Sequence, residues 1–184
     1  MIKDGVVVRH DNHTYVIDGN PKGDEIGIIT HAHADHLPSS SQGEFICSDL
    51  TYHLAQHRIG GFEQISNKNV ELVKSGHILG SRSAVIGLND RKILCTGDFT
   101  DRDSVLNQGF NYTNGITDLV IESTYGRPFY KFEEQSILEN KIVDFFNSTD
   151  NSIVAKSYSL GRAQSVEKLA RKAGIENIYV NRST

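Results

Sequence analysis

The stretch GIITHAHADHLPSS, residues 27–40, decides what this chain can be. It places His31, His33, Asp35 and His36 within six positions, straight after a short apolar run. Imidazole and carboxylate groups crowded in this way are costly to bury unless a cation lies among them. Both groups are natural ligands of Zn²⁺, so the stretch predicts a metal site. The alternative, a chance cluster of polar surface residues, is weak because HxHxDH arises in roughly one sequence of this composition per thousand.

The spacing within the stretch predicts how the ligands divide. Side chains at i and i+2 of an extended segment project to the same side, so His31 and His33 can hold one ion. Asp35 and His36 come a turn later, where they can meet a second ion.

Two further segments supply ligands after predicted strands. SGHILGS places His77 between glycines, where the backbone can approach an ion closely. CTGDFTD places Asp98 at the end of the 92–97 strand, where its carboxylate could bridge two ions. Taken alone, His77 is an ordinary loop histidine and Asp98 a turn former. Together with the histidine stretch, both are expected at one edge of a sheet.

Composition sets the wider expectations. The 184 residues suit one domain, or one domain and part of another, and 38% apolar content allows a real core. No run approaches a membrane span and the start lacks the apolar core of a secretory signal, so we expect a cytoplasmic protein. Cys47 and Cys95 form no CxxC pair, which favours reduced thiols over a disulfide.

The charge is uneven along the chain. The formal net charge is −4, with −8 in residues 1–151 and +4 in residues 152–184. A basic tail beside an acidic metal-binding body suits an anionic substrate, although a solvated helix face explains the tail equally well.

Hydrophobic patterning predicts an α/β fold, with a strand-rich first part followed by alternating helix and strand. A turn at Asp11–Asn12 joins the first two strands, and Ser48 or Asp49 caps the first helix. The predicted strands are 5–10, 14–19, 25–30, 45–47, 70–74, 83–88, 92–97, 118–122, 152–156 and 177–181, and the predicted helices are about 49–59, 138–145 and 163–173.

Asp18 after a strand, the run HAHADH, the glycine-flanked His77 and the TGD that ends in Asp98 resemble the metallo-β-lactamase superfamily in order and spacing. The resemblance implies an αββα sandwich with two divalent ions. It also implies that Asp18 orients the histidine loop through hydrogen bonds. One ion would be held by His31, His33 and His77, the other by Asp35 and His36, with Asp98 bridging them.

Two later motifs, ESTYG at 122–126 and SYSLGRAQS at 157–165, are similar to the nuclease branch of the superfamily. This branch comprises the β-CASP and mRNA 3′-end processing type, and the closest pattern is that of exonucleases associated with DNA ligases, a link to DNA repair. Glu122 matches an acidic residue of the branch. Arg162 and Ser159 are implied to bind substrate phosphate at a helix N-terminus, although Arg162 alone would be interpreted as a solvated helix residue.

The resemblance implies a metal-binding core over 1–127 and part of a β-CASP-like α/β domain over 128–184. Related enzymes complete the second metal with a late histidine, but none follows His77 here. We therefore expect either a fragment that lacks its C-terminal half or a reduced form that pairs with another chain. An unpaired strand edge at 177–181 predicts a continuation or a homo-oligomer.

The implied function is an exonuclease that hydrolyses single-stranded DNA or RNA through a metal-bound hydroxide. Asp35 or Glu122 would accept and return protons during hydrolysis, and the sequence does not distinguish between these two candidates. Histidine ligation favours zinc, while the carboxylates leave manganese open. The alternatives are a non-catalytic or partner-dependent fragment, and a hydrolase of a small molecule. The ESTYG and SYSLGRAQ motifs argue against the last.

Overall fold

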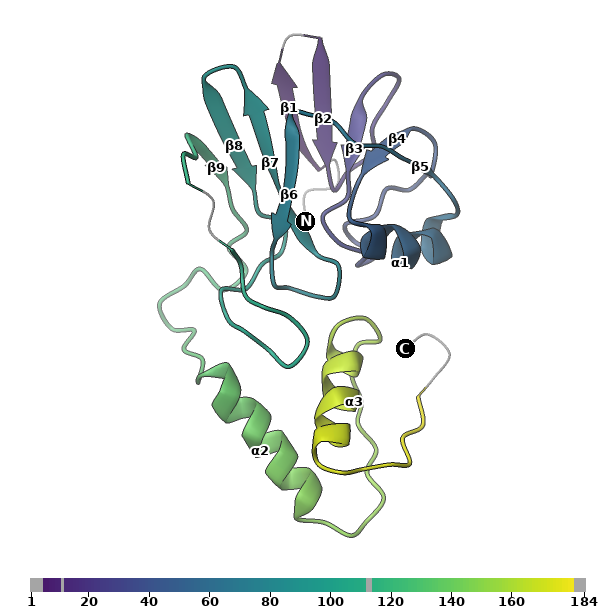
Figure 1. Cartoon of the computed structure of the whole chain (residues 1–184), viewed down its shortest axis with the longest axis vertical. Coiled ribbons are helices and arrows are strands. Elements are labelled where there is room, and N and C mark those ends of the chain that lie inside the picture. Colours follow the sequence, from purple (N-terminus) through teal and green to yellow (C-terminus); the bar gives the residue numbers. More distant parts are fainter. Residues whose placement is uncertain (1–4, 11, 112–113, 181–184) are drawn as a thin grey trace.

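The computed structural model describes residues 5–10, 12–111 and 114–180. It has a mixed α/β architecture, as predicted, with two sheets and three helices (Figure 1). None of the helices within these residues combines the length and the apolar content that crossing a membrane requires.

The first sheet follows chain order. Its first two strands are antiparallel, and each later strand adds in parallel to the one before it. The predicted hairpin is present, although Asp11 of its turn lies outside the described residues. The five strands are β1 (Val6–His10), β2 (His13–Ile17), β3 (Ile26–Ile28), β4 (Glu44–Ile46) and β5 (Glu63–Gln64), the last of which was not predicted.

The second sheet has four strands, also in chain order. β7 runs antiparallel to both of its neighbours, and the last strand adds in parallel to β8. A turn at Asn89–Asp90 joins β7 to β8, with Asn89 at φ 50°. The strands are β6 (Val70–Lys74), β7 (Arg82–Leu88), β8 (Arg91–Cys95) and β9 (Asp118–Val120).

The two sheets pack face to face over one apolar core. Tyr15 and Ile28 of the first sheet and Ile86 of the second are all at most 1% exposed within it. α1 (Asp49–Ile59) covers the opposite face of the first sheet, where its Ala55 packs with Phe45. As predicted, Ser48 caps this helix by accepting a hydrogen bond from the Thr51 N–H.

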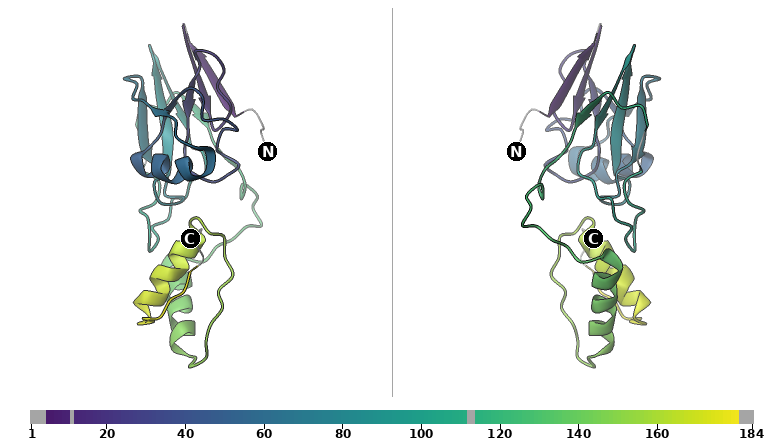
Figure 2. Two further views of the ribbon diagram at one scale, coloured as in Figure 1. Left: turned by 90° about the vertical axis from the view of Figure 1, so that its right-hand side faces the viewer. Right: turned by 90° about the vertical axis from the view of Figure 1, so that its left-hand side faces the viewer.

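α2 (Gln135–Asn147) and α3 (Arg162–Lys172) pack against each other around Phe146 and Leu169. They lie beyond one end of the sandwich rather than on a sheet face (Figures 1 and 2). The sandwich of the described residues therefore has one covering helix, α1, where the resemblance implied helices on both outer faces.

The strands predicted at 152–156 and 177–181 are wrong where the structure describes them, up to residue 180. Both segments are apolar enough for a strand, but a strand needs a hydrogen-bonded neighbour. No described strand lies beside them: Ile153 and Ile178 pack against α2 and α3 instead, while Val154 and Tyr179 are more than 90% exposed.

Candidate metal centre

The candidate ligands meet because the strands that precede them end at the same end of the sandwich. In the first sheet, parallel strands β2 and β3 lead into Asp18 and the histidine stretch. In the second sheet, β6 and β8 both run antiparallel to β7, so His77 and Asp98 also follow strands that end together. Strand direction within each sheet and the packing of the two sheets thus bring four separate segments together.

His31, His33, His77 and Asp98, the first ligand set, each offer an atom within 4.8 Å of the others. The His33 Nδ1 lies 3.1 Å from His31 Nε2 and 3.3 Å from His77 Nε2. Asp98 Oδ2 lies 3.4 Å from His77 Nε2 and 3.8 Å from His31 Nε2. Ligands about 2.0–2.1 Å from a tetrahedral ion are separated by about 3.3 Å, so the set has the spacing of a metal site.

The other oxygen of Asp98 faces a second group of ligands. Asp98 Oδ1 lies 3.4 Å from His36 Nε2, and Asp35 Oδ2 lies 3.9 Å from the same nitrogen. We call His36, Asp35 and Asp98 the second ligand set. It is more open than the first, because the Asp35 side chain is 53% exposed whereas His31 is fully buried.

Asp18 holds two of the histidines in place. Its carboxylate accepts hydrogen bonds from the Thr30 N–H at 2.8 Å, from the Thr30 hydroxyl at 2.6 Å and from His36 Nδ1 at 2.9 Å. Since the Thr30 hydroxyl donates to Asp18, it accepts from His31 Nδ1 at 3.0 Å. Both histidines therefore carry their proton on Nδ1 and present the Nε2 lone pair to the ligand sets.

Asp18, His31 and His36 also lie within 4.8 Å of one another. We assign Asp18 to the supporting role because its two oxygens are already occupied by Thr30 and His36. Thr30 was missed in the sequence; its only signal was its place directly before His31.

His33 is oriented from the other side by the segment that precedes α3. Its Nε2 lies 3.2 Å from the Leu160 carbonyl, which accepts the imidazole proton and leaves Nδ1 as the ligand atom. Leu160 itself packs against the apolar cluster under α1. This contact spans 127 residues of sequence, and no local pattern indicated it.

Burial and neighbouring charges shift the pKa values of the histidines in different directions. Burial holds the pKa of His31 far below its usual range, and the imidazoles of His36, His77 and His33 lower it further. Burial also lowers the pKa of His77, although the charge of Asp98 acts against it. For His36, the lowering by burial is outweighed by the hydrogen bond and charge of Asp18 and by the other carboxylates, so its pKa is raised.

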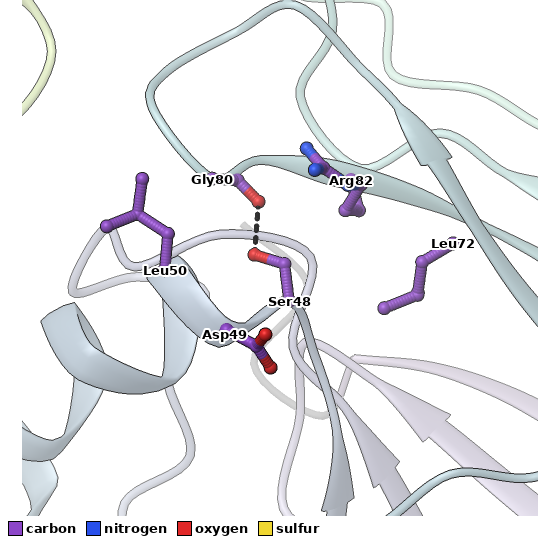
Figure 3. Close-up of a pocket in the computed structure, with 6 residues that line it drawn as sticks. All are labelled: Ser48, Asp49, Leu50, Leu72, Gly80 and Arg82. Carbon is purple, nitrogen blue, oxygen red and sulfur yellow. Dashed lines mark hydrogen bonds between the residues drawn. The ribbon is translucent and has the colours of Figure 1, made fainter.

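The loop that carries His77 is braced against the start of α1. The hydroxyls of Ser48 and Thr51 donate to the Gly80 carbonyl at 2.6 and 3.0 Å, and Figure 3 shows the Ser48 bond. Gly80 has φ +83°, and a Cβ there would lie 3.0 Å from Leu50 and Thr51. The second glycine of SGHILGS is thus needed for this close packing rather than for backbone approach to an ion.

A hollow of about 460 Å³ lies at this junction. Its walls include none of the candidate ligands, so it is separate from the candidate metal centre. The lining residues, labelled in Figure 3, are Ser48, Asp49, Leu50, Leu72, Gly80 and Arg82.

Gly97 allows Asp98 to reach the centre. It has φ +55°, and a Cβ at this position would lie 2.6 Å from the Thr30 hydroxyl. The TGD turn therefore passes directly over the threonine that supports His31.

The remaining predicted residues are Glu122, Ser159 and Arg162. Like Asp35, none of them belongs to a group of three or more ligand atoms within 4.8 Å of one another among the described residues. Glu122 follows β9; its N–H donates to Thr96 Oγ1, and its carboxylate caps the Thr124 N–H at 2.8 Å. Its charge acts to raise the pKa of His77. Arg162 is the exposed first residue of α3, and Ser159 is half-buried just before it.

Comparison with known proteins gives three relatives. A "Probable DNA ligase" of Opitutus terrae is 30% identical over 74% of this chain, and an "RNase J-like protein" of Methanocaldococcus jannaschii is 25% identical over 76% of it. An "Uncharacterized protein in lig 3'region" of Acidianus ambivalens is 27% identical over 63% of this chain and 81% of its own length. No family model matches the chain.

The resemblance to the nuclease branch of the metallo-β-lactamase superfamily is confirmed. The chain spans 15% of the length of the ligase relative and 41% of that of the RNase J-like relative. The chain therefore corresponds to less than half of either of these longer proteins.

Proposed function

We propose that this chain carries the metal centre of a phosphodiesterase that hydrolyses DNA or RNA, acting as an exonuclease on single strands. The observation that carries the proposal is the position of Asp98, whose two oxygens face two different sets of histidine and aspartate ligands. Such an arrangement suits two divalent ions a few ångströms apart. The RNase J-like and ligase relatives support nucleic acid as the substrate class.

The donor atoms fit the two divalent ions that the resemblance implies. Three imidazoles and one carboxylate at tetrahedral spacing favour zinc in the first ligand set. The second ligand set has more oxygen donors and more solvent access, which also suits manganese. When bound, such ions lower the pKa of a water molecule to near neutrality and offset charge on the phosphate oxygens.

The chain's own groups divide the remaining work. Asp98 would hold the two ligand sets at a fixed separation, and Asp18 would keep His36 and Thr30 aligned. Asp35 and Glu122 are the two carboxylates that could accept or return a proton, and both have solvent access. Among the described residues, neither carboxylate forms an ion pair with Lys or Arg, so both are available for this role.

We assign substrate phosphate to the N-terminus of α3. Gly161 there lines the same cavity as His77, and the neighbouring Leu160 carbonyl contacts His33. Backbone N–H groups and the exposed Arg162 offer a positive end to an anion that approaches the metal centre. Ser159 would add a hydroxyl donor.

We also propose that residues 1–127 form the metal-binding core and residues 128–184 form part of a β-CASP-like segment. Support comes from packing: α2 and α3 share an apolar cluster around Phe146 and Leu169, to which the core adds Val105. The segment around Leu160 meets the core at His33 and at the cluster under α1.

The test is cleavage of end-labelled single strands of DNA and of RNA in the presence of Zn²⁺ or Mn²⁺. We expect single-nucleotide products from the unmodified protein and a loss of at least about a hundredfold in the His33→Ala variant. His53→Ala is the matched control because His53 is exposed on α1, away from both ligand sets. Cleavage that survives His33→Ala would contradict the assignment of the centre.

A further inference from the structure

The segment that follows Glu122 exposes an unusual density of aromatic side chains. Tyr125, Phe129, Tyr130 and Phe132, which we call the aromatic cluster, are between 43% and 65% exposed. Exposed apolar surface on this scale marks a binding surface more often than it marks ordinary folding.

The rings support one another instead of packing into the core. Tyr125 lies 5.2 Å from Tyr130 and 5.1 Å from Phe132 between ring centroids, and Phe129 lies 4.5 Å from Tyr130. The rings of Tyr130 and Phe132 are nearly parallel, with planes 4° apart. The four rings therefore form one partly exposed cluster whose members hold one another in place.

Cations are interleaved with these rings. Arg127 and Lys131 are exposed within the same segment, and the Arg102 guanidinium lies 5.3 Å from the centroid of the Phe132 ring. The nearby Glu133 carboxylate is paired with Lys141. Aromatic faces beside positive charges match single-stranded nucleic acid, whose bases stack on rings while its phosphates meet the cations.

The cluster is connected to the metal centre through Arg102. This side chain, which lies over Phe132, also lines a cavity of about 170 Å³ that has His77 in its wall. The rest of that wall is mostly polar and suits a sugar and phosphate; it includes Thr100, Ser104, Asn107, Gln135 and Ser165. A strand whose reacting phosphate lies at the ligand sets could pass this cavity and reach the rings.

We propose that the aromatic cluster is a stacking platform for unpaired bases next to the metal centre. The proposal rests on the function proposed above and gives that function a physical reason to require single strands. Bases of a duplex are stacked on each other and offer no free face to Tyr125 or Phe129, whereas unpaired bases do.

The test uses the double variant Tyr125→Ala/Phe129→Ala, because these two side chains are the most exposed of the cluster and contribute least to the fold. Its partner, Tyr125→Phe/Phe129→Tyr, keeps both rings. Tyr179→Ala is the matched control, since Tyr179 is 93% exposed and lies outside the cluster. Affinity is measured by fluorescence anisotropy with a nuclease-resistant single strand, with the same strand lacking its bases, and with a duplex.

We expect the alanine double variant to bind the single strand about ten- to a hundredfold more weakly, as the loss of one or two stacked bases requires. The ring-keeping variant and Tyr179→Ala should bind normally. The strand without bases should bind equally to all the proteins. Equal affinity of the alanine variant for the normal strand would overturn the proposal, as would an equal loss on the strand without bases. A change in oligomeric state with unchanged strand binding would instead assign the cluster to a protein contact and would also overturn it.

Hydrolysis of bis(p-nitrophenyl) phosphate separates this proposal from the function on which it rests. This small phosphodiester has no nucleobase, so the double variant should cleave it at the unmodified rate. If the unmodified protein cleaves neither this compound nor any strand, the proposed function fails. The binding comparison would still show whether the aromatic cluster stacks on unpaired bases.

Discussion

Asp98 Oδ1 lies 3.4 Å from Nε2 of His36, and this contact joins the two ligand sets. The other Asp98 oxygen lies 3.4 Å from His77, so one carboxylate touches a loop from each sheet. Neither sheet alone could build the centre. The centre therefore depends on a fixed position of one sheet relative to the other, which the shared apolar core maintains.

Replacing Asp98 should disturb both ligand sets at once. We expect Asp98→Ala to retain less than about half of the metal that the unmodified protein binds, because each set loses an anionic ligand. Metal content after dialysis, measured by mass spectrometry, checks this. Asp101→Asn is the control, since the Asp101 side chain lies in the same loop and is 84% exposed. A normal metal content in Asp98→Ala would remove Asp98 from the centre.

Asp18 should act on metal affinity without touching an ion. Asp18→Asn loses the charge that fixes His36 Nδ1 and the Thr30 hydroxyl, so we expect metal to bind about ten- to a hundredfold more weakly. Asn is the matched replacement because Asp18 has φ 51°, a backbone conformation that Asn tolerates. Calorimetric titration with Zn²⁺ measures the effect.

Asp18→Ala adds backbone strain to the same loss. It should therefore lower the thermal midpoint of the metal-free protein more than Asp18→Asn does. If the two variants bind metal as tightly as the unmodified protein, the hydrogen bonds of Asp18 do not support the ligands.

Acid should empty the second ligand set before the first. The raised pKa of His36 means that this imidazole takes up a proton already above pH 6.5, and the proton competes with an ion. The strongly lowered pKa of His31 keeps that side chain unprotonated throughout this range, and the pKa of His77 is also lowered. Metal content measured from pH 8 to pH 5.5 should thus fall from about two ions to about one, with affinity for the second ion falling about tenfold per pH unit.

Loss of both ions at the same pH would contradict this order. His36→Ala serves as the comparison, since it should bind about one ion across the whole range and show no step.

Both cysteines should be unreactive in the folded protein. Burial raises the pKa of Cys47 to about 12, helped by the charge of Asp49, and that of Cys95 to about 11. Because the thiolate is the reactive form, we expect modification by a disulfide reagent to be at least about a hundredfold slower in the native protein than in denaturant. Both thiols are free, and they lie in different apolar clusters. Rapid native labelling would show that one of the clusters opens.

Most of the sandwich could be predicted from the sequence, because the patterns that mark its strands and the start of α1 are local. Short apolar runs bounded by Gly, Asn and Asp marked every described strand except β5 to within a few residues, and Ser48 marked the start of α1. The ligands could be expected to meet because each follows a strand. By contrast, 152–156 carries the pattern of a strand but has no neighbouring strand among the described residues, and pattern alone cannot supply one.

Contacts between distant segments could not be predicted from local sequence patterns. The Leu160 carbonyl contacts His33 through a backbone atom, which has no residue-type signature. Thr30 orients His31 because Asp18, 12 residues earlier, lies against it and accepts its hydroxyl proton. Arg102 was unremarked in the sequence, yet it lies between the cavity at His77 and the ring of Phe132. Each of these roles depends on the packing of both sheets and of α3.

The strand that leads to the histidine stretch should tolerate no added volume on its α1 side. Gly27 in β3 lies under the buried ring of Phe45, and a Cβ there would overlap that ring. Phe45 is held in turn by Phe62, 5.2 Å away between ring centroids, so it has little freedom to move. We expect Gly27→Ala to destabilise the protein by about 1–3 kcal/mol, lowering the thermal midpoint by about 2–4 °C per kcal/mol.

Gly61→Ala is the matched control, because nothing lies within 4 Å of a Cβ at that position. Since β3 positions His31 directly, the Gly27→Ala variant should also bind metal more weakly than the control. An unchanged midpoint would mean that Phe45 can leave its place without disturbing the strand that carries the centre.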